Sequence, residues 1–324
     1  MLAVQGCDSG TAAQTTAAHA ALGAQHDLTI AGARAAFESY LTISDSAAAA
    51  GDATAGLSVV ADAAWETVHA QYTALASTGA PVPRYQYGTP VFYVPTAENY
   101  PHWFLATASQ RAVDGGGTNT VLMVFGQTKQ GATWMLDGSA ALAPGQSLPA
   151  IALDADGYAT ALPTYEQSLL LPPNVVGATQ ASVVDEGPAA AAAAVIAAGP
   201  LTTGLYAQQF AESHVIAATG LDYTWLLQGS TFPVFALRTT DGGALVLYGM
   251  YVSTTRAYPD TLAGAAIPVP ANVTPLLPTS EIGYHAVAAN STYEFAAVDP
   301  AATVTHAKVT IIAASGALSY AHAY

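Results

Sequence analysis

The chain has 324 residues, of which 52% are hydrophobic and only 9% are charged, and its net charge is −15 at pH 7. Its Lys and Arg residues number 7 against 22 Asp and Glu, which excludes a nucleic-acid-binding protein, because such proteins need clustered basic side chains. The apolar content excludes a disordered chain, and the length corresponds to about two domains.

The single cysteine, Cys7, lies in the amino-terminal stretch AVQGCDSG. A small residue, Gly6, precedes it and an aliphatic residue, Val4, lies three positions before it, which is the order of a bacterial lipobox. In that motif the thiol is acylated and the leader is cut away just before the cysteine. We therefore predict that Cys7 is lipidated. The alternative is a free cysteine in a frayed tail.

Residues 1–27 are predicted to be a lipobox remnant and a flexible tether, because residues 8–27 are a low-complexity tract of Ala, Thr and Gln. A complete leader needs a positive segment and an apolar segment of about 7–15 residues. Six residues before Cys7 are too few, so we expect the true leader to begin upstream. The protein would then be anchored to the outer face of the cytoplasmic membrane, or secreted.

Two helices and four strands are predicted over residues 28–145, the first domain. Apolar residues recur every three or four positions from residue 28 to 44, including Phe37 and Tyr40, and again over residues 57–77. The Ala-rich stretch between them interrupts the pattern. Segments rich in β-branched and aromatic residues follow at 84–95, 102–113, 118–129 and 132–142, separated by turn residues.

The same order returns in the predicted second domain, residues 188–324. Residues 146–187, rich in Pro, Gly and Asp, are interpreted as a connector with short strands. Helices are expected at 188–198 and 204–218, and strands at 221–228, 234–240, 244–255, 283–298 and 308–314. The predicted fold is α+β, with two tandem units that each have helices followed by a curved antiparallel sheet.

Several separated blocks in this order resemble an uncharacterised domain family of secreted actinobacterial lipoproteins. They include PVPRYQYGTPVFYVP, LPAIALDADGYATALP, GPLTTGLYAQQ, PVFALRTTDGGALVLY and KVTIIAASGA. The resemblance implies no activity and carries over one residue, Cys7, as the lipidation site. The order of elements is also similar to the cone-shaped fold of nuclear transport factor 2-like and cystatin-like proteins, which hosts enzymes, ligand binders and assembly domains alike.

No common catalytic or nucleotide-binding motif is present in the sequence. The glycine-rich segment 114–119 is interpreted as a hairpin loop rather than a phosphate cradle, and DADG at 154–157 as a turn rather than a calcium loop. The eight histidines are scattered without ligand spacing. We therefore predict no cofactor, no metal and no catalytic residue, although a metal site assembled in the fold stays an alternative.

Six aromatic and histidine residues are the candidates for a pocket or an interface. Trp65, His69 and Tyr72 follow one another along the predicted second helix, where they could line a cavity mouth or pack in the core. The others lie in the apolar stretch YVPTAENYPHWF: Tyr100, His102 and Trp103.

These observations favour a lipid-anchored, extracytoplasmic binding or accessory protein of the bacterial cell envelope. One alternative is a structural subunit that docks onto an envelope partner or assembles with itself, with apolar side chains on exposed faces. Another is an enzyme of the nuclear transport factor 2-like fold with a pocket of His and Tyr residues, which would need a buried acid or His of shifted pKa.

Overall fold

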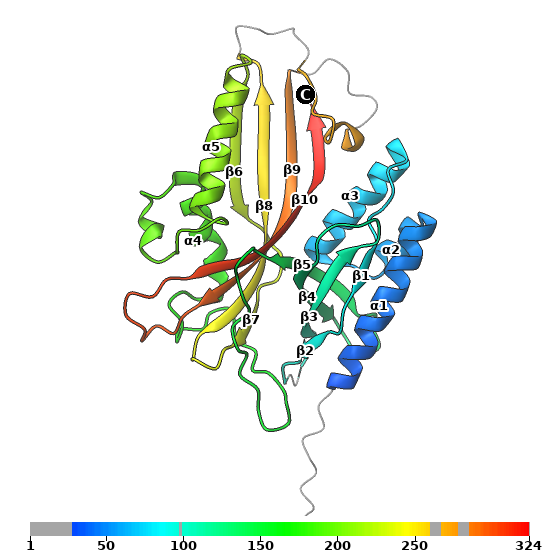
Figure 1. Cartoon of the computed structure of the whole chain (residues 1–324), viewed down its shortest axis with the longest axis vertical. Helices are drawn as coiled ribbons and strands as arrows, with labels where there is room; N and C mark the ends of the chain where they lie inside the picture. Colours follow the sequence, from blue (N-terminus) through cyan, green and yellow to red (C-terminus); the bar gives the residue numbers. More distant parts are fainter. Residues whose placement is uncertain (1–27, 97–98, 260–266, 278–284, 324) are drawn as a thin grey trace, which may run out of the picture.

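The computed structural model describes residues 28–96, 99–259, 267–277 and 285–323 (Figure 1). Cys7 and the tether predicted over residues 1–27 lie outside the described residues. Within the described part, three helices lie on one side of the strands and two lie on the opposite side, as Figure 1 shows.

The first helices follow the predicted apolar stripe. Helix α1 (Ile30–Ala50) begins at Thr29, whose side chain accepts a hydrogen bond from the Gly32 N–H, and ends at Gly51 with φ of 68°. It continues through the alanines where we expected a break, because Ala has the highest helix propensity. Helices α2 (Ala53–Leu57) and α3 (Asp62–Thr78) follow.

The strands of the first half are confirmed at the predicted places. They are β1 (Tyr85–Tyr87), β2 (Val91–Tyr93), β3 (His102–Ala112), β4 (Asn119–Gln127) and β5 (Met135–Leu142). Strands β3, β4 and β5 pair in sequence order, and β1 and β2 both pair with β3. The segment 114–119 connects β3 to β4, so it is a hairpin loop.

The secondary structure predicted for the connector, residues 146–187, is wrong. The segment contains helix α4 (Pro173–Glu186), and isolated β-bridges replace the expected short strands. Pro173 occupies the first turn, where a missing N–H costs no hydrogen bond. Val176, Val183 and Val184 are buried on one face of α4, so tertiary packing overrides their β-propensity. The helix expected at 188–198 is only a short 3₁₀ turn, η1 (Ala191–Ala194).

The second half contains the remaining predicted elements. Helix α5 (Thr203–Ala217) precedes β6 (Asp222–Gly229), β7 (Phe235–Arg238) and β8 (Ala244–Ala257). A 3₁₀ turn, η3 (Thr274–Leu276), precedes β9 (Ala286–Asp299) and β10 (Thr310–Ala323). Strand β10 extends well beyond the predicted end at residue 314.

All these strands form one antiparallel sheet of ten strands, in the order β1-β3-β4-β5-β10-β9-β8-β6, with β7 beside β8. The α+β class is therefore confirmed. The sheets expected for two units meet edge to edge where Leu142 and Ala141 of β5 pair with Ala313 and Ala314 of β10. The division into domains at 28–145 and 188–324 stays a prediction.

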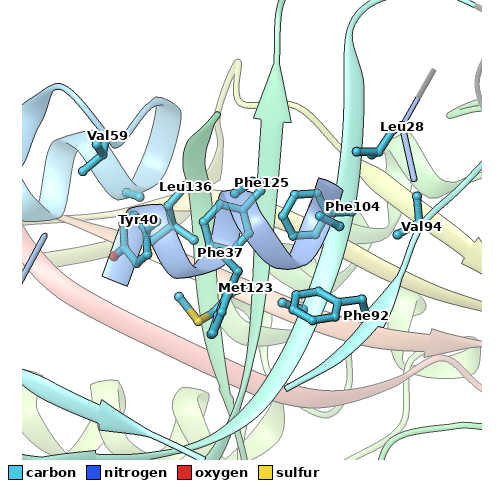
Figure 2. Close-up of a cluster of buried hydrophobic side chains, with 14 of the residues drawn as sticks. Leu28, Phe37, Tyr40, Val59, Phe92, Val94, Phe104, Met123, Phe125 and Leu136 are labelled. Carbon is cyan, nitrogen blue, oxygen red and sulfur yellow. The ribbon is translucent and has the colours of Figure 1, made fainter. Parts of the chain in front are cut away.

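Three of the four clusters of buried side chains in the described residues define the layers. The first, shown in Figure 2, packs α1 against β2–β5 and includes Phe37, Phe104 and Phe125. The second packs α4 against β8 and β9. In the third, Leu105 and Leu122 of the first half meet Leu237 and Leu245 of the second. The two halves of the sheet therefore pack face to face, with helices on the outer sides.

Candidate functional site

The candidate site lies where β10 separates from β5. Beyond the pairing at Ala141, the N–H of Ser139 is bound by the side-chain carboxylate of Glu294, on β9. At Leu136 the free edge of β5 is completed by the segment before α3: the Leu136 N–H donates to Val59 (2.9 Å), and the Ala61 N–H donates to the Leu136 carbonyl (2.8 Å). The backbone groups of Ser139 and Leu136 are therefore hydrogen-bonded although β10 has moved away from β5, and space remains between the two strands.

A cavity of about 730 Å³ occupies this gap, between α1 and α3 on one side and β5, β9 and β10 on the other. Its lining combines apolar, aromatic and polar side chains, and each of these three kinds comes from several helices and strands. Apolar side chains include Val60, Val68, Met123 and Leu136; the aromatic ones are Tyr40, Tyr72, Tyr85 and Tyr87; polar ones include Gln110, Ser139, Thr292, Glu294 and Ser315.

Glu294 of β9 supplies a carboxyl group to the lining of the cavity. The pKa of Glu294 is raised to about 8, mainly by burial; the hydrogen bond from the Ser139 N–H lowers it, and the nearby carboxyls of Asp137 and Asp62 add to the rise. Burial, together with the charge of Asp62, also raises the pKa of Asp137 to about 7. Glu294 is thus poised to change its charge near neutral pH.

Two glycines provide the space that these carboxylates occupy. A Cβ atom on Gly138 would collide with the carboxylate of Glu294, and one on Gly126 would collide with that of Asp137. Both glycines lie within strands, where glycine is otherwise unfavourable. The space that a side chain would occupy is therefore filled by an acid at each glycine: by Asp137 of β5 at Gly126, and by Glu294 of β9 at Gly138.

Tyrosine hydroxyls surround the cavity on the side of α1 and β1. Tyr40 packs edge-on against Phe125 at 5.3 Å between ring centroids, and burial raises the pKa of Tyr40 well above its usual range. Figure 2 shows Tyr40 beside Leu136 at one end of the aromatic cluster. The Tyr87 hydroxyl accepts a hydrogen bond from Gln110 (2.8 Å), and burial raises the pKa of Tyr87 to about 12.

An ion pair lies at the rim of the cavity. The Arg84 guanidinium donates to both carboxylate oxygens of Asp45, each at 2.8 Å. Both side chains are about 40% exposed, with 39% for Arg84 and 44% for Asp45, so the pair marks where the cavity meets the surface. Its two charges neutralise each other.

The structure brings one residue of the predicted helical trio to the cavity. Tyr72 is buried and lines it, with its hydroxyl against Gly56. Trp65 and His69 do not line it: their rings stack on each other at 4.7 Å on α3, with Trp65 39% exposed.

The second predicted trio lies at the start of β3, away from the cavity. His102 is buried, and its ring stacks on Tyr100 at 3.9 Å. Trp103 packs against Phe235 of β7, so it joins the two halves of the sheet. Whether either trio binds a partner stays a prediction.

Sequence reasoning missed the residues that shape the cavity. Tyr40 was assigned to the apolar stripe of its helix, and Glu294 was not singled out. The available signal for Glu294 was a lone acid in an apolar strand, within STYEFAAV, since unpaired carboxylates are rarely placed in such strands without a local reason.

The chemistry open to this site is proton exchange or pairing with a cation, through Glu294. In the part of the chain that the structure describes, no group of three or more His, Cys, Asp or Glu side chains is arranged to hold a metal ion. The DADG segment forms a turn, in which the Asp154 carboxylate accepts hydrogen bonds from the N–H groups of Asp156 and Tyr158.

Comparison with known proteins places the chain in a family. An uncharacterized lipoprotein of Streptomyces avermitilis is 32% identical over 160 residues, covering 48% of this chain and 44% of the relative. An uncharacterized lipoprotein of Streptomyces coelicolor is 28% identical over 184 residues, covering 55% of this chain and 51% of the relative. The chain thus aligns with about half the length of these curated relatives.

No solved structure matches the chain. Among the helices of the described residues, none has the length and apolar character needed to cross a membrane. A family model, Domain of unknown function (DUF8094), matches residues 24–322. This match and the two lipoprotein relatives confirm the resemblance to an uncharacterised actinobacterial lipoprotein family, and the chain belongs to the DUF8094 domain family.

Proposed function

We propose that the protein is a lipid-anchored, extracytoplasmic binding protein of the cell envelope, which holds a small molecule in the cavity between α1, α3 and β10. The relatives named as lipoproteins and the lipobox at Cys7 support the location. The cavity supports the binding role. Its volume of about 730 Å³ falls within the range of small-molecule sites, about 300–1,000 Å³.

The composition of the lining is the second support for binding. Small-molecule sites combine apolar and aromatic walls with a few placed polar groups. Here Val68 and Leu136 supply apolar wall, Tyr40 and Tyr87 supply rings with hydroxyls, and Glu294 supplies one ionisable group. The walls come from helices and from strands of both halves, so a ligand would contact elements far apart in the sequence.

Filling the cavity tests the binding function. Val68→Trp places an indole ring in the cavity from α3, where Val68 forms part of the wall. We expect the variant to lose binding of every small molecule that binds the wild type. A panel of fragment-sized compounds, each followed by protein-observed NMR and by thermal shift, measures this loss, and chemical analysis of the recovered compounds shows whether any is converted.

The matched control is Ala76→Trp, which adds the same ring on the same helix at an exposed position outside the cavity. It should bind the panel as the wild type does. The binding function is contradicted if no compound shifts wild-type resonances of cavity residues, or if Val68→Trp and Ala76→Trp bind equally well.

The lipid anchor is tested at Cys7. When the chain is expressed in a Streptomyces host behind a lipoprotein leader, we expect the wild type in the membrane fraction with the mass of an added lipid, because acyl chains hold a protein at the bilayer. Cys7→Ser should appear in the medium, while Ser9→Ala should stay membrane-bound. A wild-type protein without added lipid would overturn the proposal.

Docking onto another envelope protein, or onto a second copy of the chain, stays a second candidate function. The observation that favours it is the surface of α5, on which Phe210 is 51% exposed and Val215 is 69% exposed. Interfaces bury apolar and aromatic side chains of this kind. The stretch YVPTAENYPHWF offers less, because Val94, His102 and Phe104 are buried.

A further inference from the structure

The charge of the cavity identifies the class of ligand. Arg84 and Asp45 neutralise each other at the rim, which leaves Glu294 as the lining residue whose charge has no ion-pair partner among the described residues. On the basis of the proposed binding function, we infer that the cavity takes a small organic cation, an apolar body with one protonated amine, and that Glu294 is the counter-ion of the amine.

The groups that face Glu294 from each packed element favour a positive ligand. Asp137 approaches from β5 and Asp62 from α3, both of the same sign as Glu294, and the Tyr40 hydroxyl approaches from α1. The single basic side chain of the lining, Arg84, is already engaged by Asp45. A negatively charged ligand would meet like charges without a partner, whereas a cation would provide the missing one.

Hydrogen-bonding capacity beside Glu294 suits an ammonium group. A primary ammonium has three N–H donors and no acceptor. The lining includes Ser139 on β5, Thr292 on β9 with Glu294, and Ser315 on β10. A hydroxyl oxygen accepts two hydrogen bonds, so these oxygens can accept the remaining N–H groups, the Ser315 oxygen in addition to the Ala141 N–H that it already accepts. The apolar body of the ligand would then lie against Val68, Met123 and Leu136.

Amine binding should release a proton. Because burial raises the pKa of Glu294 to about 8, the empty cavity holds a neutral carboxyl group at pH 7. A bound ammonium stabilises the carboxylate instead, so the Glu294 proton leaves to solvent while the ligand keeps its own. One O–H bond breaks, no covalent bond to the ligand forms, and the bound pair is neutral.

Three probes of nearly equal shape test the inference: phenethylamine, 2-phenylethanol and 3-phenylpropionate. Calorimetric titration of the wild type at pH 8 should show phenethylamine binding at least tenfold tighter than 2-phenylethanol, and no binding of 3-phenylpropionate. Glu294→Gln should bring the amine to within threefold of the alcohol and leave the alcohol unchanged, because only the charge is removed. Asp222→Asn, which removes a carboxylate at an exposed position on β6 outside the cavity, should keep the preference for the amine.

Proton linkage provides a readout that a structural role of Glu294 would not move. Between pH 6 and pH 8 the affinity for phenethylamine should rise towards tenfold per pH unit, then level off once Glu294 is ionised in the empty protein. Titrations at pH 7 in buffers of different ionisation enthalpy should show nearly one proton released per amine bound. Neither effect is expected for 2-phenylethanol or for Glu294→Gln.

The outcomes separate this inference from the proposed function. If the alcohol binds as tightly as the amine and Val68→Trp abolishes both, the cavity is a binding site but its ligand is not a cation. If the three probes fail to bind while other compounds from the fragment panel bind, the inference fails and the binding function stands. If nothing binds the wild type at the cavity, both fail.

Discussion

Phe125→Ala is expected to lower the free energy of unfolding by about 3–5 kcal/mol, the range for truncation of a buried Phe. Phe125, on β4, is fully buried in the cluster of Figure 2. Its ring stacks on Phe104 at 4.9 Å and meets Tyr40 and Phe37 edge-on at 5.3 and 5.9 Å. Truncation would remove three aromatic contacts at once and leave a void between α1 and the sheet.

Surroundings made of other large rings cannot easily collapse into this void. The loss of unfolding free energy should therefore reach the stated range, whereas a site whose neighbours can move into the void would lose less. Denaturant unfolding followed by circular dichroism measures it. Phe210→Ala is the matched control, because Phe210 is 51% exposed on α5, and it should cost under about 1 kcal/mol. Equal losses in the two variants would contradict the assignment of this cluster as the core of the first half.

Periodicity and turn residues were sufficient to predict most helices and strands. The stripe through Phe37 and Tyr40 predicted α1, and segments rich in β-branched and aromatic residues, separated by turn residues, predicted β3, β4 and β5. The turn between β7 and β8 is equally local: it contains Asp241-Gly242-Gly243, and Gly242 has φ of 84°, a conformation that favours glycine. These are local signals, encoded within a few residues of where they act.

Features that depend on contacts distant in sequence were not predictable in this way. Helix α4 is rich in Val, and its helical state depends on burial of that face against β8. The union of two sheets rests on the pairing of Ala141 and Leu142 with Ala314 and Ala313, across more than half of the chain. Neither short segment carries a pattern that specifies its partner.

The cavity follows from the same long-range pairing. Because β10 leaves β5 after Ala314, Glu294 binds the Ser139 N–H that a strand would otherwise bind. The sequence presents Glu294 only as an isolated acid in a strand. Of the residues predicted for a pocket, Tyr72 alone lines it, since the helix that carries it has one face towards the gap while Trp65 and His69 lie outside it.

Glu294→Gln is expected to stabilise the protein at pH 8 by about 4 kcal/mol. An unfolded Glu has a pKa of 4.5, whereas burial raises the pKa of folded Glu294 to about 8. Between these values the folded state holds one proton more than the unfolded state, so stability falls as pH rises, by about 1.4 kcal/mol per pH unit. The contribution of Glu294 is fully present below pH 4.5 and is lost by about pH 8. Gln has no proton to lose.

Burial also raises the pKa of other acids, to about 7 for Asp137 and for Asp299. These acids are present in both proteins, so the difference between wild type and Glu294→Gln reports on Glu294 and should grow from pH 5 to pH 8. Denaturant unfolding at pH 5, 7 and 8 measures it. Asp45→Asn, which removes the partner of Arg84, should instead destabilise the protein at pH 7, because that ion pair lowers the pKa of Asp45.

The sign of the Glu294 effect connects stability to the proposed ligand. Ionised Glu294 lowers the stability of the empty protein at pH 8, so packing does not explain the presence of this acid. A cation bound beside the carboxylate would offset that loss of stability. Phenethylamine should therefore raise the unfolding free energy of the wild type more at pH 8 than at pH 6, and leave that of Glu294→Gln nearly unchanged at the same concentration. If Glu294→Gln is no more stable than the wild type at pH 8, ionised Glu294 costs the empty protein no stability, and a bound cation would have no such cost to offset.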